Sequence, residues 1–387
     1  RAAQRAAMYI VVSLPIQHNH ENTWRQLLGV AGDLCTCIAE LDVPQGLRVG
    51  TLDSLLGLSD DLTKASSSAE GIVAKLRRTH DDLGSRDAHG AGSSSGQHAE
   101  PLTVDGLSVP RYLTTFKWDH AKHPTRRSLR ETVDKLCETL GKIEEELKLK
   151  ASDYQSVKGQ INSLSRKTGG SLVVRDVSDL VSPEMLVESE NLTTLLVAVP
   201  RHLDKEWVAC YETLAGFVVP RSSKCLAEEG EYALFTVVLF RRVLDEFKHN
   251  ARAKGFQVRE FTYDPEGQSA KADERAGLER MARDKRDSLL EWCHASHAEA
   301  LGAMMHLCTV RIFVESILRY GLPPAFQAGV LEPHPRQQKK LRTALAGTFA
   351  AAASEHWSED AAGDDKLPGS EDVHPYVSFT IPDAVCA

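Results

Sequence analysis

Two histidines and two cysteines near the N-terminus are of types that could bind a transition metal. His18 and His20 precede Glu21 in an expected loop, and Cys35 and Cys37 follow on an expected helix. Imidazole nitrogen and thiolate sulfur are ligands that zinc prefers in proteins. The C-x-C spacing lacks the second pair of ligands that makes a zinc signature specific, so we predict neither a metal site nor a cofactor.

A second group of reactive residue types lies near residue 300. His294 and His297 follow Cys293 on an expected helix, and their spacing of three residues puts both rings on one face. His306 and Cys308 continue the same scatter of polar positions. We interpret these side chains as helix packing or as a solvated face rather than as a catalytic group.

The segment Gly92-Ser93-Ser94-Ser95-Gly96 matches the G-x-S-x-G pattern of a hydrolase nucleophile. That motif needs a strand before it and a helix after it. Here both flanks belong to a Gly/Ser/His-rich stretch, residues 84–100, which we expect to be a disordered loop. The chain also has no P-loop, no G-x-G-x-x-G and no H-E-x-x-H pattern, so we predict that it is not an enzyme.

The composition limits the class of protein further. With 387 residues the chain can form two or three domains, and its net charge of −8 argues against a nucleic-acid binder. No run approaches 18 consecutive apolar residues, so we expect no membrane span. The eight cysteines are scattered along the chain, which favours free thiols in a reducing compartment.

The strongest pattern is a heptad seam from Leu129 to Leu164. Alternate steps of four and three residues reach an apolar or aromatic residue every time, except at Lys150. Charged residues such as Glu144 fall at outward positions. The seam predicts a helix from about Thr125 to residue 168, roughly 50 Å in length, which suits a spacer or a scaffold better than a compact enzyme. The alternative is a long bundle helix inside a compact all-α domain.

The remaining elements follow from the hydrophobic periodicity. We predict helices over residues 21–40, 204–216, 239–254 and 270–320, a turn followed by a helix within residues 47–62, and a further helix to about residue 83. We predict strands over residues 9–15, 172–177, 192–200, 232–240, 256–263 and 374–382, the last in the same sheet as residues 9–14.

Two long helices that flank one inserted domain predict an antiparallel neck. The chain would leave along one helix, build a head and return along the other, so that both termini share a second domain. The fold class is therefore mixed α+β, with a globular α/β head, a two-helix neck and a discontinuous α+β foot. The predicted boundaries are 1–124 for the first part of the foot, 125–167 and 266–320 for the neck, 168–265 for the head and 321–387 for the rest of the foot.

Arginine next to aromatic or apolar residues at element boundaries is typical of protein interfaces. Arg319 and Tyr320 precede Gly321 and two prolines, and Arg221 follows an apolar Val-Val-Pro run shortly before Lys224. We predict Arg221, Lys224, Arg319 and Tyr320 as partner-interface residues. The alternative is that both strings are structural turns.

At these strings the sequence resembles the C-subunit family of V-type proton-pumping ATPases. The resemblance covers nearly all of the chain except residues 1–7, 84–100 and about 344–366. The segments that carry it are 47–62 (LRVGTLDSLLGLSDDL), 116–129 (FKWDHAKHPTRRSL), 170–181 (GSLVVRDVSDLV), 190–200, 218–223 (VVPRSS), 311–326 (RIFVESILRYGLPPAF) and 375–381.

The resemblance implies an elongated dumbbell without a catalytic site, on the cytosolic face of vacuolar and other endomembranes. Its head would bind a peripheral stalk, a heterodimer of the E and G subunits. Its foot would bind a second E/G stalk and the cytoplasmic N-terminal domain of the membrane a-subunit. The implied role is a stator that leaves the pump during reversible disassembly, with actin as a further partner.

Two other classes of function remain open at this point. The first is a free-standing coiled-coil scaffold or an actin-binding adaptor, for which a longer rod and repeated modules are typical. The second is an enzyme in the α/β region 170–264, which predicts a deep polar cleft there.

Overall fold

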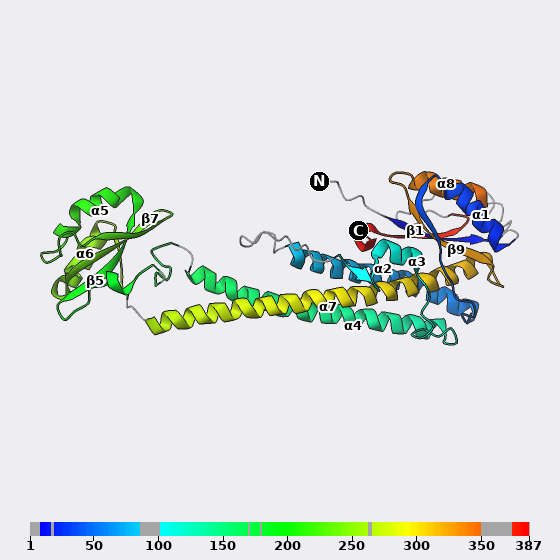
Figure 1. Ribbon diagram of the computed structural model, residues 1–387, viewed down its shortest axis with the longest axis horizontal. Coiled ribbons are helices and arrows are strands. Elements are labelled where there is room, and N and C mark those ends of the chain that lie inside the picture. The colour runs from blue at the N-terminus through cyan, green and yellow to red at the C-terminus, as the bar shows by residue number, and fades with distance from the viewer. Residues whose placement is uncertain are drawn as a thin grey trace. The chain divides into compact units, whose positions relative to one another are not determined.

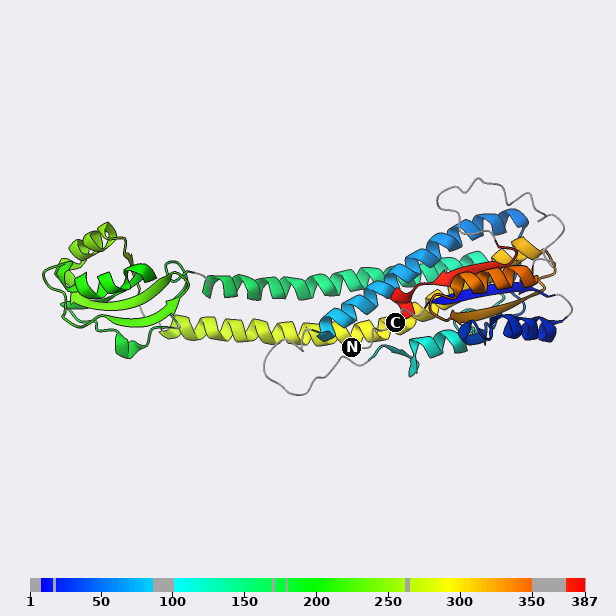
Figure 2. The same cartoon turned by 90° about the horizontal axis from the view of Figure 1, so that it is seen from above.

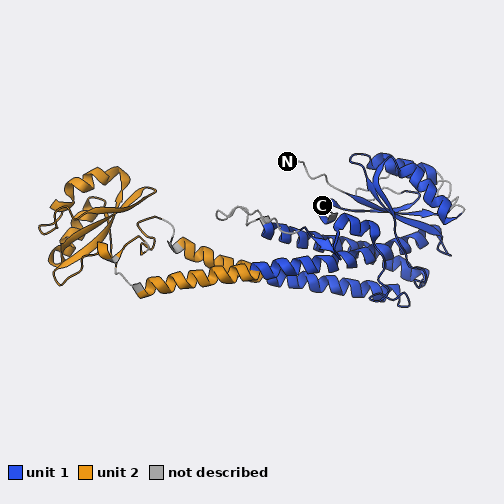
Figure 3. Cartoon of the chain, in the orientation of Figure 1, with its two compact units in different colours: residues 1–151, 286–387 blue, residues 152–285 orange. Residues whose placement is uncertain are grey.

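The computed structural model describes residues 8–16, 19–85, 101–168, 171–178, 180–261, 265–349 and 374–386. The fold is mixed α and β, with antiparallel sheets and long helices (Figure 1). The chain divides into two compact units, residues 1–151 with 286–387 (unit 1) and residues 152–285 (unit 2) (Figure 3).

The sheet of unit 1 brings the two ends of the chain together. It contains β1 (Tyr9–Pro15), β2 (Cys35–Glu40), β9 (Phe326–Pro333) and β10 (Val377–Ile381) in the order β10-β1-β9-β2. Strand β1 pairs antiparallel with β10, from Tyr9 opposite Ile381 to Ser13 opposite Val377. This confirms the predicted strand near the C-terminus and its place in the same sheet as residues 9–14.

The two faces of β1 have different neighbours, because successive side chains point to opposite sides of a strand. Ile10, Val12 and Leu14 are buried in one cluster with side chains of α1 (His20–Ala31) and α8 (Gln338–Phe349), which lie on the same side of the sheet (Figure 2). On the other face, the hydroxyl of Ser316 donates to the hydroxyl of Ser13 at 2.6 Å. The strand is therefore buried along its whole length.

The predicted helix 21–40 is wrong in its second half. Helix α1 starts at the cap residue Asn19, whose side-chain oxygen accepts a hydrogen bond from the backbone amide of Asn22 at 2.7 Å, and it ends at Ala31. Residues 35–40 form strand β2 instead, because they pair with β9, with a bulge between Cys35 and Cys37. A neighbouring strand with unpaired backbone groups outweighs the local helical preference.

Three long helices continue unit 1. They are α2 (Leu52–Ser85), the first part of α4 (Leu129–Thr168) and the later part of α7 (Pro265–Tyr320). Helix α2 is one helix of 34 residues, where the sequence suggested two. Helix α4 begins at Leu129 rather than Thr125, because the hydroxyl of Ser128 accepts a hydrogen bond from the backbone amide of Glu131 at 3.2 Å and so caps it.

The apolar residues of the heptad seam of α4 are buried from Leu129 to Val157, whereas Ile161 and Leu164 are partly exposed. Within unit 1, Leu136, Leu140 and Leu147 are each at most 6% exposed. Ion pairs join the flanks, from Lys75 of α2 to Glu144 at 2.5 Å and from Arg130 to Asp61 at 2.6 Å. Among the described residues, α7 is the one helix long and apolar enough to cross a membrane, and 83% of its most apolar window is buried inside the protein, as in a core helix.

Short elements complete unit 1. Strands β3 (Thr103–Val104) and β4 (Leu107–Ser108) form a hairpin whose turn residues, Asp105 and Gly106, both have positive φ, as this two-residue turn requires. Helix α3 (Val109–Thr115) follows directly, and α9 (Asp383–Cys386) ends the described chain.

Unit 2 contains a second antiparallel sheet. Its strands are β5 (Leu192–Pro200), β6 (Lys224–Glu229), β7 (Tyr232–Phe240) and β8 (Gln257–Arg259), in the order β6-β7-β5-β8. Helices α5 (Asp204–Cys210) and α6 (Leu244–Ala253) pack on it. Single 3-10 turns are η2 (Pro183–Met185), η3 (Arg201–Leu203), η4 (Tyr211–Thr213) and η5 (Arg241–Val243).

The predicted strand 172–177 is wrong, because these residues form turns. The Asp176 carboxylate accepts a hydrogen bond from the backbone amide of Ser178 at 3.0 Å, and the Arg259 guanidinium donates to the carbonyls of Leu172 at 2.8 Å and Arg175 at 2.6 Å. Side chains therefore bind the backbone groups that a strand would use. Of the predicted strand 256–263, residues 257–259 form β8, and residues 262–263 lie outside the described residues. The predicted helices 204–216 and 239–254 shorten to α5 and α6.

Candidate interaction surface

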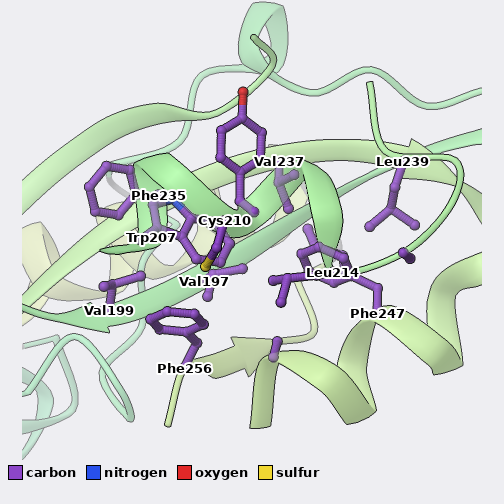
Figure 4. Packing of buried hydrophobic residues seen from close by; sticks show 14 of the residues in the cluster. Val197, Val199, Trp207, Cys210, Leu214, Phe235, Val237, Leu239, Phe247 and Phe256 are labelled. Atoms are coloured by element: carbon purple, nitrogen blue, oxygen red, sulfur yellow. The ribbon is translucent and has the colours of Figure 1, made fainter. Parts of the chain in front are cut away.

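The hydrophobic core of unit 2 packs against the segment that leads into the edge strand β6, where the predicted interface residues Arg221 and Lys224 lie. Trp207 of α5 is fully buried, with Phe256 and Phe247 packed edge-on against its ring at centroid distances of 5.1 and 6.4 Å (Figure 4). Its indole N–H donates to the hydroxyl of Ser223 at 2.9 Å. The segment that leads into β6 is thereby fixed to the aromatic core.

Residues 217–219 extend this edge of the sheet. The backbone amide of Val219 donates to the carbonyl of Val238 at 2.9 Å, and the amide of Phe240 donates to the carbonyl of Phe217 at 3.1 Å. The segment 217–229 therefore follows the same side of β7 twice, first beside its C-terminal end and then, as β6, beside its N-terminal half.

Two exposed phenylalanines and an arginine form a compact group at the C-terminal end of β7, which we call the Phe217–Phe240–Arg242 patch. Phe217 is 48% exposed and Phe240 is 36% exposed, and their ring centroids lie 6.0 Å apart. The Arg242 guanidinium lies 3.5 Å from the Phe217 centroid and 5.6 Å from the Phe240 centroid. Such stacking leaves the N–H groups at the edge of the guanidinium free to bind a carboxylate.

The neighbouring arginine has a different role. Arg241 donates to the carbonyl of Ser189 at 3.0 Å and pairs with Glu188 at 3.3 Å. Arg242, in contrast, pairs with no carboxylate among the residues that the structure describes. The patch thus presents apolar area and an arginine without an ion-pair partner, a combination enriched in the energetic centres of protein interfaces.

Arg221 lies in the turn between residues 217–219 and β6, and its backbone is left-handed, with φ of 58°. Its backbone amide donates to the Glu212 carboxylate at 2.9 Å, which also accepts from the Tyr211 hydroxyl at 2.9 Å. These donors, the Arg221 amide first, lower the pKa of Glu212. The turn is held by its backbone, so the exposed Arg221 side chain extends to solvent.

Lys224 begins β6 at the outer edge of the sheet and is exposed. Its backbone amide donates to the hydroxyl of Thr236 at 3.3 Å. A bulge between Cys225 and Ala227 and an ion pair between Glu228 and Arg201 at 2.6 Å follow along the strand. Charges and a bulge are features that discourage strand-to-strand aggregation at an open edge.

Arg319 and Tyr320 have internal partners within unit 1. The Arg319 guanidinium donates to the carbonyl of His374 at 2.8 Å. The Tyr320 hydroxyl donates to the carbonyl of Ser13 at 2.6 Å and accepts from the amide of Val377 at 3.1 Å. Burial raises the pKa of this tyrosine to about 12. The structure therefore separates the four predicted residues, with Arg221 and Lys224 on one edge and the other two elsewhere.

The histidines considered for chemistry are packed inside unit 1. His297 is fully buried, neither of its ring nitrogens has a hydrogen-bond partner in the described part of the chain, and burial lowers its pKa to about 4. The backbone amide of Asp119 donates to Nε2 of His306 at 3.1 Å, so Nδ1 carries the proton and donates to the Gly302 carbonyl at 2.6 Å. His306 is thus held neutral between two backbone groups.

The N-terminal metal candidates that the structure describes have other places and partners. His20 hydrogen-bonds to Gln327 at 2.8 Å, whereas Cys35 and Cys37 lie on β2, and His18 is outside the described residues. Among the described residues no group of three or more His, Cys, Asp or Glu side chains could hold a metal ion. The segment 92–96 with the hydrolase-like pattern also lies outside them.

Sequence reasoning missed the Phe217–Phe240–Arg242 patch. Phe217 and Phe240 are 23 positions apart in the sequence, and only strand pairing brings them together. The one available signal was the Phe-Arg-Arg string at the end of an apolar strand. Lys150, the exception in the heptad seam, lies over the Trp292 ring at 5.8 Å, so its place in the seam is filled by a cation–π contact.

Comparison with known proteins covers nearly the whole chain. The family profile described as the V-ATPase C subunit matches residues 9–377. A V-type proton ATPase C subunit of Arabidopsis thaliana is 47% identical over 96% of this chain and 98% of its own length. Those of Caenorhabditis elegans and Xenopus tropicalis are 38% and 36% identical, each over 96% of this chain and 96% and 97% of their own lengths.

Proposed function

The chain belongs to the V-ATPase C-subunit family, and from this premise we propose that it is a non-catalytic stator component of the V-type proton pump. As a member of that family it assembles with other V-ATPase subunits. In the proposal it bridges two E/G peripheral stalks and the cytoplasmic N-terminal domain of the membrane a-subunit. It acts at the cytosolic face of the membrane and supports ATP-driven acidification without taking part in hydrolysis.

The observation that carries the proposal is the pair of long helices through which the chain leaves and re-enters unit 1. Helix α4 has 40 residues and α7 has 56, and each contains residues of both units. In unit 1 Lys150 of α4 lies over Trp292 of α7, and in unit 2 Asp153 of α4 pairs with Lys285 of α7 at 3.1 Å. The partner's residue number falls as that of α4 rises, so the two helices are antiparallel. An antiparallel helix pair of this length suits a load-bearing connection.

The head, neck and foot remain part of this proposal, with the head at 168–265, the neck at 125–167 and 266–320, and the foot at 1–124 and 321–387. We assign the main stalk grip of the head to the Phe217–Phe240–Arg242 patch together with the adjacent edge at Arg221 and Lys224. The exposed aromatic area and three cationic side chains there suit an acidic, partly apolar helical partner.

The same arrangement suits a component that must leave the complex on demand. Several interfaces of moderate size hold such a bridge by avidity, and release of one lowers the effective concentration of the others. The patch is small, and the rest of its edge is polar and solvent-exposed. We therefore expect the assembly to dissociate cooperatively once one contact is lost.

An add-back experiment tests the proposal. Membranes that carry the pump without this component receive the purified chain, and ATP hydrolysis and proton uptake are followed together. We expect the chain alone to hydrolyse no ATP, and its addition to restore proton uptake coupled to hydrolysis. Full proton pumping without the chain, or ATP hydrolysis by the isolated chain, would contradict the stator role.

A further inference from the structure

A cavity of about 760 Å³ lies along the outer strand of the unit 1 sheet. Strand β10 forms one wall, with α8 and the C-terminal turns of α7 on the others. The volume lies in the range of roughly 300–1,000 Å³ that is usual for small-molecule sites. The cavity is in unit 1 and has no residue in common with the interaction surface of unit 2.

The charged lining of this cavity is mostly cationic. Arg319, Lys339 and Arg342 contribute three positive side chains, and His374 adds an imidazole. In the described residues, two neutral groups bind the Arg342 guanidinium, Nε2 of His374 at 3.3 Å and the Thr380 hydroxyl at 3.2 Å. Arg342 pairs with no carboxylate in the described part of the chain, and these two contacts fix the direction of its planar fork.

Among the lining residues that the structure describes, the one carboxylate is already neutralised. Glu315 accepts a hydrogen bond from Nε of Arg311 at 2.6 Å, and both side chains are largely buried. The guanidinium carbon of Arg311 lies over the Phe379 ring, 4.6 Å from the ring centroid. Because this pair has no net charge, the described lining residues carry a net positive charge from Lys339, Arg342 and Arg319.

Two further features of the lining favour an anion that also carries hydroxyl groups. Gln338 and Lys339 are the first residues of the 12-residue helix α8, so the positive end of its dipole is at the cavity. The hydroxyls of Ser378 and Thr380 lie on the same face of β10, and Ser59 faces them from α2. Hydroxyl and amide side chains bind the alcohol groups of a polyol.

We propose that this cavity binds a phosphorylated polyol, with the phosphate on Arg342, Lys339 and Arg319 and the polyol hydroxyls on the Ser59, Ser378 and Thr380 side. A bare phosphate would leave most of the volume empty. The same chemistry occurs in a soluble inositol phosphate and in the headgroup of an inositol phospholipid. The site is independent of the stator role and of the stalk-binding surface.

Isothermal titration of the full chain with inositol 1,4,5-trisphosphate, and separately with inorganic phosphate, tests the site. We expect the inositol phosphate to bind at least about tenfold more tightly than phosphate, with affinity that falls as salt is raised. Arg342→Ala and Lys339→Ala should each weaken binding roughly tenfold or more, since hydrogen bonds to charged groups contribute most. Arg342→Lys should recover only part of the loss.

Lys340→Ala is the matched control, because Lys340 is an exposed neighbour on α8 outside the lining, and it should leave affinity unchanged. Circular dichroism melts confirm that each variant is folded. Flotation with vesicles that contain or lack phosphatidylinositol phosphate identifies the source, since binding to the soluble ligand alone indicates a metabolite and binding to both indicates a lipid headgroup. Absence of binding in every arm, or equal binding by wild type, Arg342→Ala and Lys339→Ala, would overturn the proposal.

Discussion

The hydroxyl of Tyr320, the last residue of α7, donates a hydrogen bond to the backbone carbonyl of Ser13 in the central strand β1 at 2.6 Å. The same oxygen accepts from the amide of Val377 at 3.1 Å. One side chain thus joins the end of the longest helix to the strands contributed by both ends of the chain. These contacts assign Tyr320 a structural role inside unit 1.

Tyr320→Phe should lower the free energy of unfolding by about 1–3 kcal/mol, because it leaves a buried amide and a buried carbonyl without a partner. Urea denaturation followed by circular dichroism measures the change. Tyr154→Phe is the control, since the Tyr154 hydroxyl makes no hydrogen bond among the described residues, and it should change stability little. Equal stability of wild type and Tyr320→Phe would contradict the structural role.

Unit 1 should lose stability as the pH falls from about 6.5 toward 4. Burial lowers the pKa of His297 to about 4, with further lowering by Arg77, His80 and His294. Below about pH 6.5 this histidine is protonated in the unfolded chain but not in the folded chain. Its contribution to stability is therefore complete above that pH and decreases below it.

His297→Leu should flatten this pH dependence and leave stability at pH 7 unchanged or higher, because neither ring nitrogen has a hydrogen-bond partner to lose. Denaturation midpoints at pH 7.5, 6.0 and 5.0 measure the slope for wild type and variant. His249→Leu, on α6 of unit 2, is the control and should keep the wild-type slope. Parallel profiles for wild type and His297→Leu would show that His297 does not control the acid sensitivity.

The thiols should react in an order set by burial. Burial raises the pKa of Cys35 to about 11 and those of Cys293 and Cys308 to about 12, whereas Cys137 and Cys225 are exposed. Iodoacetamide at pH 8 should therefore modify Cys137 and Cys225 first and the other three only after denaturation. Peptide mass spectrometry gives the order, and early modification of Cys293 or Cys308 would contradict the packing of α7.

Leu140→Pro should uncouple ATP hydrolysis from proton transport in the assembled pump. Leu140 is 3% exposed in the seam of α4, and a proline there removes a helical hydrogen bond and bends the helix at a cost of about 3 kcal/mol. Leu140→Met keeps volume and helix and should couple normally. If Leu140→Pro does not fold, Glu145→Gly with Glu146→Gly softens the same helix from its outer face. Normal coupling in a folded, assembled variant would contradict the load-bearing role of the helix pair.

Much of the fold could be predicted because the patterns that specify it are regular. The seam from Leu129 follows from apolar spacing, and the long second helix follows from a run of mixed charges that continues into apolar positions. Both helices are present. The placement of residues 9–14 and the C-terminal strand in one sheet followed from two short apolar runs. These features depend on local periodicity that no neighbour overrides.

The wrong predictions concern segments whose structure is set by contacts with residues far away in the sequence. Cys35–Glu40 is a strand because its backbone pairs with β9. Residues 172–177 form turns because Arg259, more than 80 positions away, donates hydrogen bonds to the carbonyls of Leu172 and Arg175. The Phe217–Phe240–Arg242 patch needs the register of β7 before its members meet. A single sequence contains no local signal for contacts of this kind.

The stator function is best tested by calorimetric binding of the full chain to a purified E/G heterodimer. The proteins compared are wild type, Arg242→Ala and Phe217→Ala. Arg252→Ala is the control, because Arg252 is an exposed arginine on α6 outside the patch. We predict tight binding by wild type and Arg252→Ala, and a loss of roughly tenfold or more for each patch variant, because truncating a stacked arginine or an aromatic anchor removes much of an interface's binding energy. Wild-type affinity in both patch variants would show that the E/G heterodimer binds another surface of the chain. Absence of binding by the wild-type chain would contradict the stator function itself.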